Sequence, residues 1–301
     1  MSQQPTTAEE TPPAEAAYDG YATDYRDWWA PVIAPAAGRL LDRLDGRLTA
    51  DARATLVDIG TGTGTLALAA LRRWPRARVI GVDPARRLLE MAEAEARAAG
   101  LAARLEVRVG DAASLPLDAG SADIAMSSFV LQLVPNRLAA VREAFRVLRP
   151  GGSFACLTWR ADEDPFEPED VFDDVLEDLH IEPPKRSPGR GRSYTSPASA
   201  SAEFRRAGFR SVHAREEWLE HRFTPASYVD VAEHWTEEDT FASLDEPMRQ
   251  GLRAEVVRRL GLLHPDRLVW RRPLVSVVGK VPEAGSAEDA AELSANTASV
   301  L

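Results

Sequence analysis

Residues 58–64 read Asp58-Ile59-Gly60-Thr61-Gly62-Thr63-Gly64 and join a short apolar run at 55–59 to a run of helical spacing at 66–73. A glycine-rich turn between a strand and a helix lets backbone N–H groups approach a ligand with no Cβ in the way. The dinucleotide pattern Gly-x-Gly-x-x-Gly would need a glycine at position 65, where the chain has Thr65. A carboxylate at Asp58 would also repel a nearby pyrophosphate, because both groups are anionic, and it instead favours a ligand that carries an ammonium group.

Short β-branched runs alternate with longer runs of helical spacing around this turn. The predicted strands are 55–59, 78–82, 105–109, 123–127 and 153–159, and the predicted helices between them are 66–73, 86–99 and 138–148. Such alternation is typical of right-handed β–α–β units and of a mostly parallel sheet with helices on both faces. The sequence therefore predicts a doubly wound, Rossmann-like α/β domain.

The patterns outside this core are weaker. Helical spacing predicts helices at 31–46, 171–179, 197–207, 225–236 and 246–263, two extended runs lie at 210–223 and 267–280, and 183–196 is predicted to be a loop. The helices within 225–263 are interpreted as an insertion on the sheet. The segments 1–17 and 282–301 lack apolar periodicity and are predicted to be disordered tails. We therefore expect one domain at 18–281, made of an N-terminal helical part at 18–46, a ligand-binding core at 54–160 and the insertion.

Composition narrows the class of function. The chain has 301 residues, of which 45% are hydrophobic and 28% charged, as is typical of a globular protein. No apolar stretch is long enough for a membrane span and the first residues do not form a signal peptide, so we expect a cytoplasmic protein. A net charge of −11 disfavours nucleic acid as a partner, despite the basic run at 185–192, and favours a small molecule. A single cysteine, Cys156, and five scattered histidines indicate no metal site.

Acidic residues also follow the next two predicted strands. Asp83, followed by Pro84, ends the second strand, where a carboxylate can accept hydrogen bonds from both hydroxyls of a ribose. Asp111 lies between Gly110 and Ala112 after the third strand and can accept from the exocyclic amine of an adenine, for which its small neighbours leave room. Acceptors for an ammonium group, a ribose and an adenine at successive strand ends point to S-adenosylmethionine, which has all three groups and no phosphate.

Residues 54–160 resemble a class I S-adenosylmethionine-dependent methyltransferase. The resemblance rests on the glycine turn, on the two acidic strand ends, on the fourth strand and on Leu148-Arg149-Pro150-Gly151-Gly152 before the fifth strand. It implies a seven-stranded sheet of order 3-2-1-4-5-7-6 with an antiparallel last strand, which 267–280 fits. The chain is most similar to the branch of ubiquinone/menaquinone-type and natural-product methyltransferases. There an N-terminal helix, here 18–29, closes over the cofactor, and the segment between strands six and seven builds the acceptor pocket.

The candidate cofactor-binding residues lie in the glycine turn, at the following strand ends and in the N-terminal helix. They are Asp58, Gly60, Thr61, Gly62, Gly64, Asp83, Pro84, Gly110, Asp111, Ala112, Ser128, Phe129 and Tyr25. For some of them a structural role is an alternative: Asp83 can cap the helix after Pro84, and the apolar residues of 127–133 can belong to the core.

Aromatic residues are concentrated at the start of the expected domain, ahead of its ligand-binding core. Tyr18, Tyr21, Tyr25, Trp28 and Trp29 either pin a helix to the edge of the sheet or form a lid that excludes water and faces the sulfonium with π-density. The candidates for the acceptor pocket are Tyr21, Trp29, Trp159 and Trp235, for which the alternative is a place in the core. His234 is a candidate general base, and a solvated surface histidine is its alternative.

These residues lead to one expected activity and one alternative. We expect methyl transfer from S-adenosylmethionine to a small-molecule acceptor of secondary metabolism, with S-adenosylhomocysteine as the product and a monomer or homodimer as the active form. The alternative is a cofactor-binding protein of the same fold with cyclase-like or regulatory chemistry. An RNA or protein methyltransferase is disfavoured, because Ser127-Ser128-Phe129-Val130 stands where such enzymes have an Asn/Asp-Pro-Pro-Tyr motif.

Overall fold

The computed structural model describes residues 21–49, 53–161, 164–184 and 193–283. The predicted tails therefore lie outside the described residues, apart from Pro282 and Glu283, and so do Tyr18 and the basic run at 185–192. None of the helices in the described ranges has the length and apolar character needed to cross a membrane.

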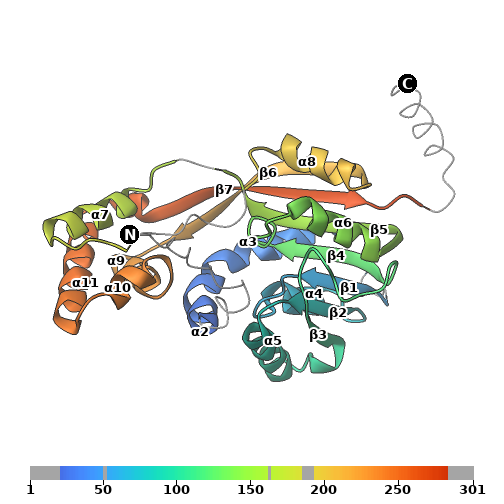
Figure 1. Cartoon of the computed structure of the whole chain (residues 1–301), viewed down its shortest axis with the longest axis horizontal. Coiled ribbons are helices and arrows are strands. Elements are labelled where there is room, and N and C mark those ends of the chain that lie inside the picture. The colour runs from blue at the N-terminus through green and yellow to red at the C-terminus, as the bar shows by residue number, and fades with distance from the viewer. Residues whose placement is uncertain (1–20, 50–52, 162–163, 185–192, 284–301) are drawn as a thin grey trace, which may run out of the picture.

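Seven strands form one sheet in the order β3-β2-β1-β4-β5-β7-β6 (Figure 1). They are β1 (Thr55–Ile59), β2 (Arg78–Asp83), β3 (Leu105–Val109), β4 (Ala122–Ser128), β5 (Leu148–Trp159), β6 (Arg210–Arg222) and β7 (Val269–Lys280). Neighbouring strands from β1 to β5 run parallel, whereas β7 runs antiparallel to both β5 and β6. The strand order and the antiparallel last strand that the resemblance implied are confirmed.

Helices cover both faces of this sheet and enclose two hydrophobic cores. One core includes residues of α3 (Ala30–Asp42) and α4 (Thr65–Arg73), and the other includes residues of α6 (Arg137–Val147) and α8 (Pro197–Arg206). The helix α5 (Arg86–Ala98) packs beside β2 and β3. Successive residues of β1 point into opposite cores, Leu56 into the first and Val57 into the second. Because both faces are covered, the carboxyl ends of the parallel strands are left as the edge at which a ligand can bind.

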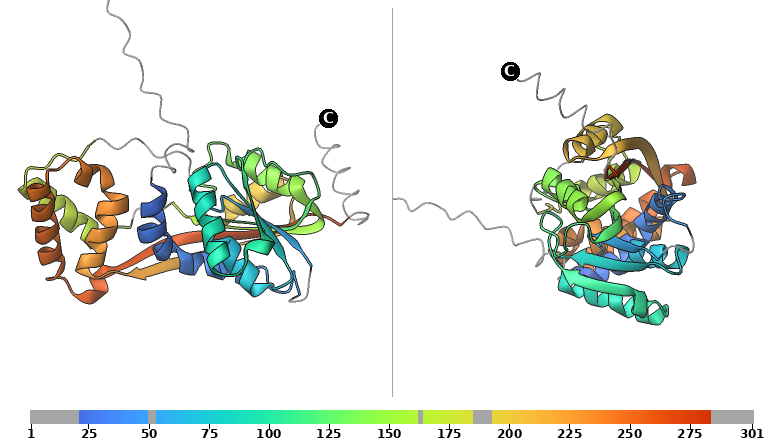
Figure 2. Two further views of the ribbon diagram at one scale, coloured as in Figure 1. Left: turned by 90° about the horizontal axis from the view of Figure 1, so that it is seen from below. Right: turned by 90° about the vertical axis from the view of Figure 1, so that its right-hand side faces the viewer.

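A third hydrophobic core lies at the far end of β6 and β7, away from the parallel strands (Figure 2, left). It buries Phe172 of α7 (Glu167–Asp178), Val229 of α9 (Pro225–Val231) and Leu252 of α11 (Glu246–Leu260), next to the short α10 (Glu238–Ala242). The helices of 225–263 form an insertion between β6 and β7, as predicted, and they lie at the end of these two strands, which are 13 and 12 residues long compared with 5 residues for β1 and β3. The sequence did not predict that α7 packs with them.

The N-terminal helices differ from the prediction in their connection. Instead of separate helices at 18–29 and 31–46, the described chain is helical without a break from α2 (Ala22–Asp24) through a π turn, η1 (Tyr25–Trp29), to the end of α3. Pro31 suggested a helix start, since proline lacks an N–H donor. In the structure the wider π turn, in which the Ala30 N–H bonds to the Tyr25 carbonyl, lies directly before this proline.

A buried ion pair ties the end of β5 to the helices of the second core. Glu203 of α8 is 6% exposed and accepts hydrogen bonds from Arg137 Nε of α6 and from the Tyr194 hydroxyl, each at 2.8 Å. The Arg137 guanidinium also lies 3.9 Å from the centre of the Tyr194 ring. Because Tyr194 pairs with Arg160 just after β5, this contact fixes the chain beside the ligand-binding edge of the sheet.

Candidate active site

A cavity of about 260 Å³ lies at the carboxyl ends of β1, β2 and β4. Ten of the thirteen candidate cofactor-binding residues line it, namely Tyr25, Gly60, Gly62, Asp83, Pro84, Gly110, Asp111, Ala112, Ser128 and Phe129. Asp58 and Thr61 line a smaller adjoining cavity, which shares Tyr25, Gly60 and Ser128 with the first. Gly64 lines neither of them, and a Cβ there would meet the Ala92 side chain of α5 at 3.0 Å. The third glycine therefore lets α4 pack closely against α5.

The glycine turn has the backbone shape that a close-bound ligand needs. Gly60 and Gly62 have φ angles of +72° and +53°, a region that side chains disfavour. A Cβ on Gly60 would lie 2.2 Å from Val130 Cγ2, whereas a Cβ on Gly62 would meet nothing nearer than Tyr25, 3.8 Å away. Gly60 thus allows the segment after β4 to approach β1, and Gly62 leaves open space beneath the aromatic ring of Tyr25.

Asp83 links the turn to the next strand. Its carboxylate is 7% exposed, and its two oxygens accept hydrogen bonds from the Gly62 N–H and the Ala85 N–H, both at 2.9 Å. The bond to the N–H of Ala85 holds the turn between β2 and α5, in which Ala85 is the N-cap residue, and α5 has no side-chain cap. The carboxylate thereby joins the glycine turn after β1 to the end of β2 at the edge of the cavity.

Asp58 is buried at the end of β1, with 1% of its surface exposed. Burial raises the pKa of this carboxyl to about 7, and the nearby charge of Asp83 acts in the same direction. Hydrogen bonds from the Thr61 hydroxyl, at 2.9 Å, and from the Ala67 N–H oppose the rise in pKa but do not cancel it. A cationic group placed in the adjoining cavity would favour the ionised form of this carboxyl.

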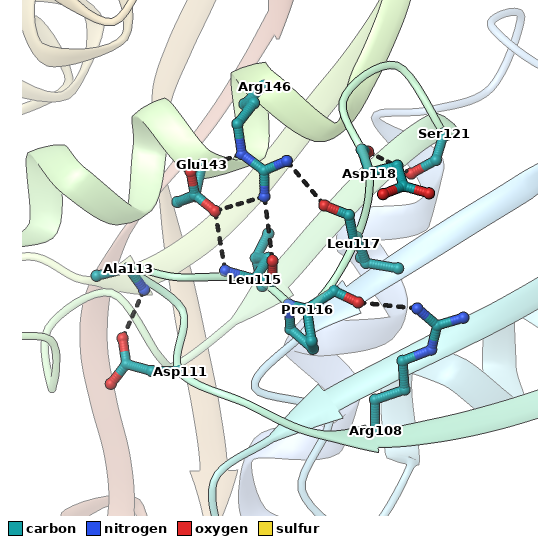
Figure 3. A network of polar contacts seen from close by, with 10 residues as sticks. All are labelled: Arg108, Asp111, Ala113, Leu115, Pro116, Leu117, Asp118, Ser121, Glu143 and Arg146. Carbon is teal, nitrogen blue, oxygen red and sulfur yellow. Dashed lines mark hydrogen bonds and ion pairs between the residues drawn. The ribbon is translucent and has the colours of Figure 1, made fainter.

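The loop that carries Asp111 is held in place by α6 and β3 (Figure 3). The Asp111 carboxylate accepts a hydrogen bond from the Ala113 N–H at 2.6 Å. Arg146 of α6 donates to the Leu117 carbonyl at 2.7 Å, and Glu143 of the same helix accepts from the Leu115 N–H at 2.9 Å. The acidic end of β3 therefore has a defined position at the cavity although it lies on a loop.

Aromatic rings from three parts of the chain enclose the cavity. Tyr25 and Trp29 come from the π turn η1, and Trp235 comes from a second π turn, η3 (Ala232–Thr236), which packs against the first. The Trp235 ring centre is 5.4 Å from Tyr25 and 6.2 Å from Trp29. On the sheet side, Phe129 and Trp159 have their ring centres 4.6 Å apart. All five rings line the cavity, so they limit the access of water to it.

His234 and Tyr21, the candidates for the base and for part of the acceptor pocket, do not line this cavity either. The His234 ring stacks on Trp28 with a centre distance of 4.5 Å, and its Nδ1 lies 2.8 Å from the Asp230 carbonyl. Tyr21 is 37% exposed and lines a separate cavity, where the charge of Glu238 raises the pKa of its hydroxyl. The structure therefore places the candidate base outside the cavity wall, because the π turn directs Trp235 rather than its neighbour inward.

The segment after β4 contributes more of the wall than the sequence predicted. Residues of this segment that line the cavity, beyond Ser128 and Phe129, are Val130, Gln132, Leu133, Val134 and Pro135. The Gln132 side chain donates to the Phe129 carbonyl at 2.6 Å and accepts a hydrogen bond from the Thr158 hydroxyl of β5. A glutamine within an apolar run directly after a strand was the available signal for this part of the wall.

Comparison with known proteins agrees with this geometry. Residues 57–156 match a family described as "Methyltransferase domain". A ubiquinone/menaquinone biosynthesis C-methyltransferase of Dinoroseobacter shibae is 39% identical over 102 residues, which are 34% of this chain and 41% of the relative. The nocamycin O-methyltransferase of Saccharothrix syringae is 35% identical over 136 residues, which are 45% of this chain and 47% of the relative. The chain thus spans less than half the length of these curated relatives.

Two solved structures share the fold. The YcgJ protein of Bacillus subtilis superposes with a TM-score of 0.54 at 21% identity, over 82% of this chain and 99% of that one. The [4+2]-cyclase SpnF superposes with a TM-score of 0.56 at 20% identity, over 90% of this chain and 96% of that one. Identities this low support the architecture alone. Both structures share the seven-stranded fold that the sequence resembles, and within it residues 57–156 are similar to the methyltransferase domain family.

Proposed function

We propose that this domain binds S-adenosylmethionine and transfers its methyl group to a small-molecule acceptor. The observation that carries the proposal is the cavity of about 260 Å³, which is lined both by carboxylates at the ends of β2 and β3 and by five aromatic rings. An adenosyl group with a sulfonium centre matches this lining, since hydroxyl and amine donors suit carboxylates and a cation suits π-density.

Each acidic strand end has a separate role in this proposal. Asp83 accepts the ribose hydroxyls, Asp111 accepts the adenine amine and Asp58 faces the ammonium group in the adjoining cavity. Tyr25 covers the methionine part from above Gly62, where a side chain at position 62 would intrude on the ligand. The cofactor, when bound, supplies an electrophilic methyl group.

The chain itself acts chiefly by positioning and by excluding water. Among the described residues that line the main cavity, the titratable side chains are Asp83, Asp111 and Tyr25. The two carboxylates are assigned to the cofactor, so the acceptor's reactive atom is held in line by the aromatic wall rather than deprotonated by a dedicated base. Holding reactants at about 3–3.5 Å can supply much of the rate without acid–base catalysis.

The two relatives indicate the class of the proposed acceptor. Likeness to a C-methyltransferase of quinone biosynthesis and to the nocamycin O-methyltransferase supports an organic small molecule, with natural-product biosynthesis as the proposed setting. We further propose that the described part of 18–281 works as one unit, because the N-terminal helix and the far helices both contribute rings to the same cavity. The cytoplasm is the proposed location.

Calorimetric titration with S-adenosylhomocysteine tests cofactor binding. The wild-type protein should bind it, Asp83→Asn and Asp111→Asn should weaken binding at least tenfold, and Arg97→Gln, an exposed change on α5, should leave it unchanged. Unaltered affinity in both acidic variants would show that the site is misassigned. Incubation of the wild type with S-adenosylmethionine and candidate acceptors then tests transfer through release of S-adenosylhomocysteine. Binding without any release across acceptor classes would favour the non-methylating alternative.

A further inference from the structure

A second cavity of about 620 Å³ adjoins the proposed cofactor cavity and has a different lining. It shares Trp29 and Trp159 with that cavity and adds Trp270 and two arginines, Arg160 and Arg272. The indole rings of Trp29 and Trp159 therefore lie between this cavity and the proposed cofactor cavity. A molecule in the larger cavity can place one end at these rings, beside the proposed position of the methyl group.

The three tryptophans form a continuous aromatic surface. Their ring centres are 6.4 Å apart for Trp29 and Trp159, 5.6 Å for Trp29 and Trp270, and 5.7 Å for Trp159 and Trp270. The rings come from the N-terminal helix, the end of β5 and the start of β7, so tertiary structure alone brings them together. Indole rings make favourable contacts with planar aromatic groups in offset or edge-to-face geometry.

The two arginines differ in how fully they are engaged. Arg272 donates to the Asp164 carbonyl at 2.7 Å and lies 3.3 Å from the Glu169 carboxylate. Arg160, which follows Trp159 directly, has a buried Nε that makes no hydrogen bond with any described residue. That nitrogen lies 3.1 Å from a Glu216 carboxylate oxygen, but the two groups are not aligned for a hydrogen bond. A buried donor in this state costs free energy that an anionic ligand oxygen would offset.

We propose that this cavity binds an acceptor with a planar aromatic body and an anionic oxygen group, and that Arg160 is the residue that selects the anion. The aromatic body lies against the three indole rings, and the anionic group, such as a carboxylate, binds the Arg160 guanidinium in competition with Glu216. The proposal rests on the proposed function, because it names the acceptor class for the same site. Arg160 here is a specificity-determining residue that contacts the acceptor away from the methylated atom.

Two probes that differ only in charge test the proposal. Naphthalene-2-carboxylate and the neutral naphthalene-2-carboxamide are titrated into the wild type, Arg160→Gln, Glu216→Gln and the surface control Arg97→Gln, with binding followed by tryptophan fluorescence. Each titration is run with and without saturating S-adenosylhomocysteine, and circular dichroism confirms that every variant is folded.

The wild type and Arg97→Gln should bind the carboxylate about tenfold more tightly than the carboxamide, the change expected for one charge-assisted hydrogen bond. Arg160→Gln should abolish this preference, and Glu216→Gln should increase it because the competing carboxylate is gone. The proposal is overturned by a preference that survives in Arg160→Gln, by a weaker preference in Glu216→Gln, by displacement of S-adenosylhomocysteine or by no binding of the carboxylate. If S-adenosylhomocysteine itself does not bind, the proposed function fails, and the cofactor-free titrations still decide the role of Arg160.

Discussion

The buried carboxyl of Asp58 predicts that cofactor affinity depends on pH. Burial raises the pKa of Asp58 to about 7 in the ligand-free protein, so the group holds a proton at mildly acidic pH. In the proposed complex it faces the ammonium group of the cofactor and must be ionised to pair with it. Binding below pH 7 therefore requires release of this proton, and the affinity should fall as the pH falls.

The size of the effect follows from the pKa. With a pKa of about 7, about half of the carboxyl is ionised at pH 7.0 and about 3% at pH 5.5, so the apparent affinity should drop about fifteen-fold between these values. The ligand's amine stays largely charged in this range, since α-amino groups titrate near pH 7.7–8.0. No histidine is among the described residues that line either of the two cavities of the cofactor site, so no imidazole there would contribute to this pH dependence.

The assay is calorimetric titration of S-adenosylhomocysteine at pH 5.5 and 7.0 into the wild type and Asp58→Asn. The asparagine variant keeps the size of the side chain but has no proton to lose, so its affinity should be weaker at pH 7.0 and nearly equal at the two pH values. Titrations in two buffers of different ionisation enthalpy should also show up to one proton released by the wild type at pH 5.5. A wild-type affinity that does not change with pH, or an equal pH dependence in Asp58→Asn, would show that Asp58 does not pair with the ammonium group.

Three further predictions concern the turn, the ribose acceptor and the buried ion pair. Asp83→Asn should lower the free energy of unfolding by about 1–3 kcal/mol in urea titrations, because one buried N–H, of Gly62 or the helix start, loses a charged acceptor; an unchanged midpoint would contradict this. Gly60→Ala should lower the free energy of unfolding by about 1–3 kcal/mol, since residue 60 has a φ of +72° and its Cβ would lie 2.2 Å from Val130 Cγ2. Adding Val130→Ala should restore part of the lost melting temperature, and no recovery would argue against the clash. Glu203→Gln should lower the free energy of unfolding in urea titrations by about 2 kcal/mol and leave S-adenosylhomocysteine affinity unchanged. A loss of affinity at unchanged stability would mean that the ion pair is not purely structural.

The core of the fold could be read from local patterns. Hydrophobic periodicity indicated each strand from β1 to β4 and the helices between them to within one or two residues. The reason is that burial fixes the spacing of apolar residues along each element, and this spacing can be read from that element's own sequence. The start of β5 was placed five residues late, at 153 instead of Leu148, since Leu148 pairs with Ala122 across an irregular register that has no local signature. The acidic strand ends were also visible, because carboxyl ends of parallel strands meet at one edge.

Local sequence patterns were enough to predict the doubly wound core, the glycine turn and the position of Asp83 and Asp111 at one end of the sheet, since these depend on neighbours within a few residues. The contacts between aromatic rings became visible with the three-dimensional fold. It joined Trp29 to Trp235 through two π turns, brought Trp270 beside Trp159 and turned His234 away from the cavity. These contacts join segments far apart in the chain, where periodicity carries no information, and they set the shape of the space in which an acceptor would bind.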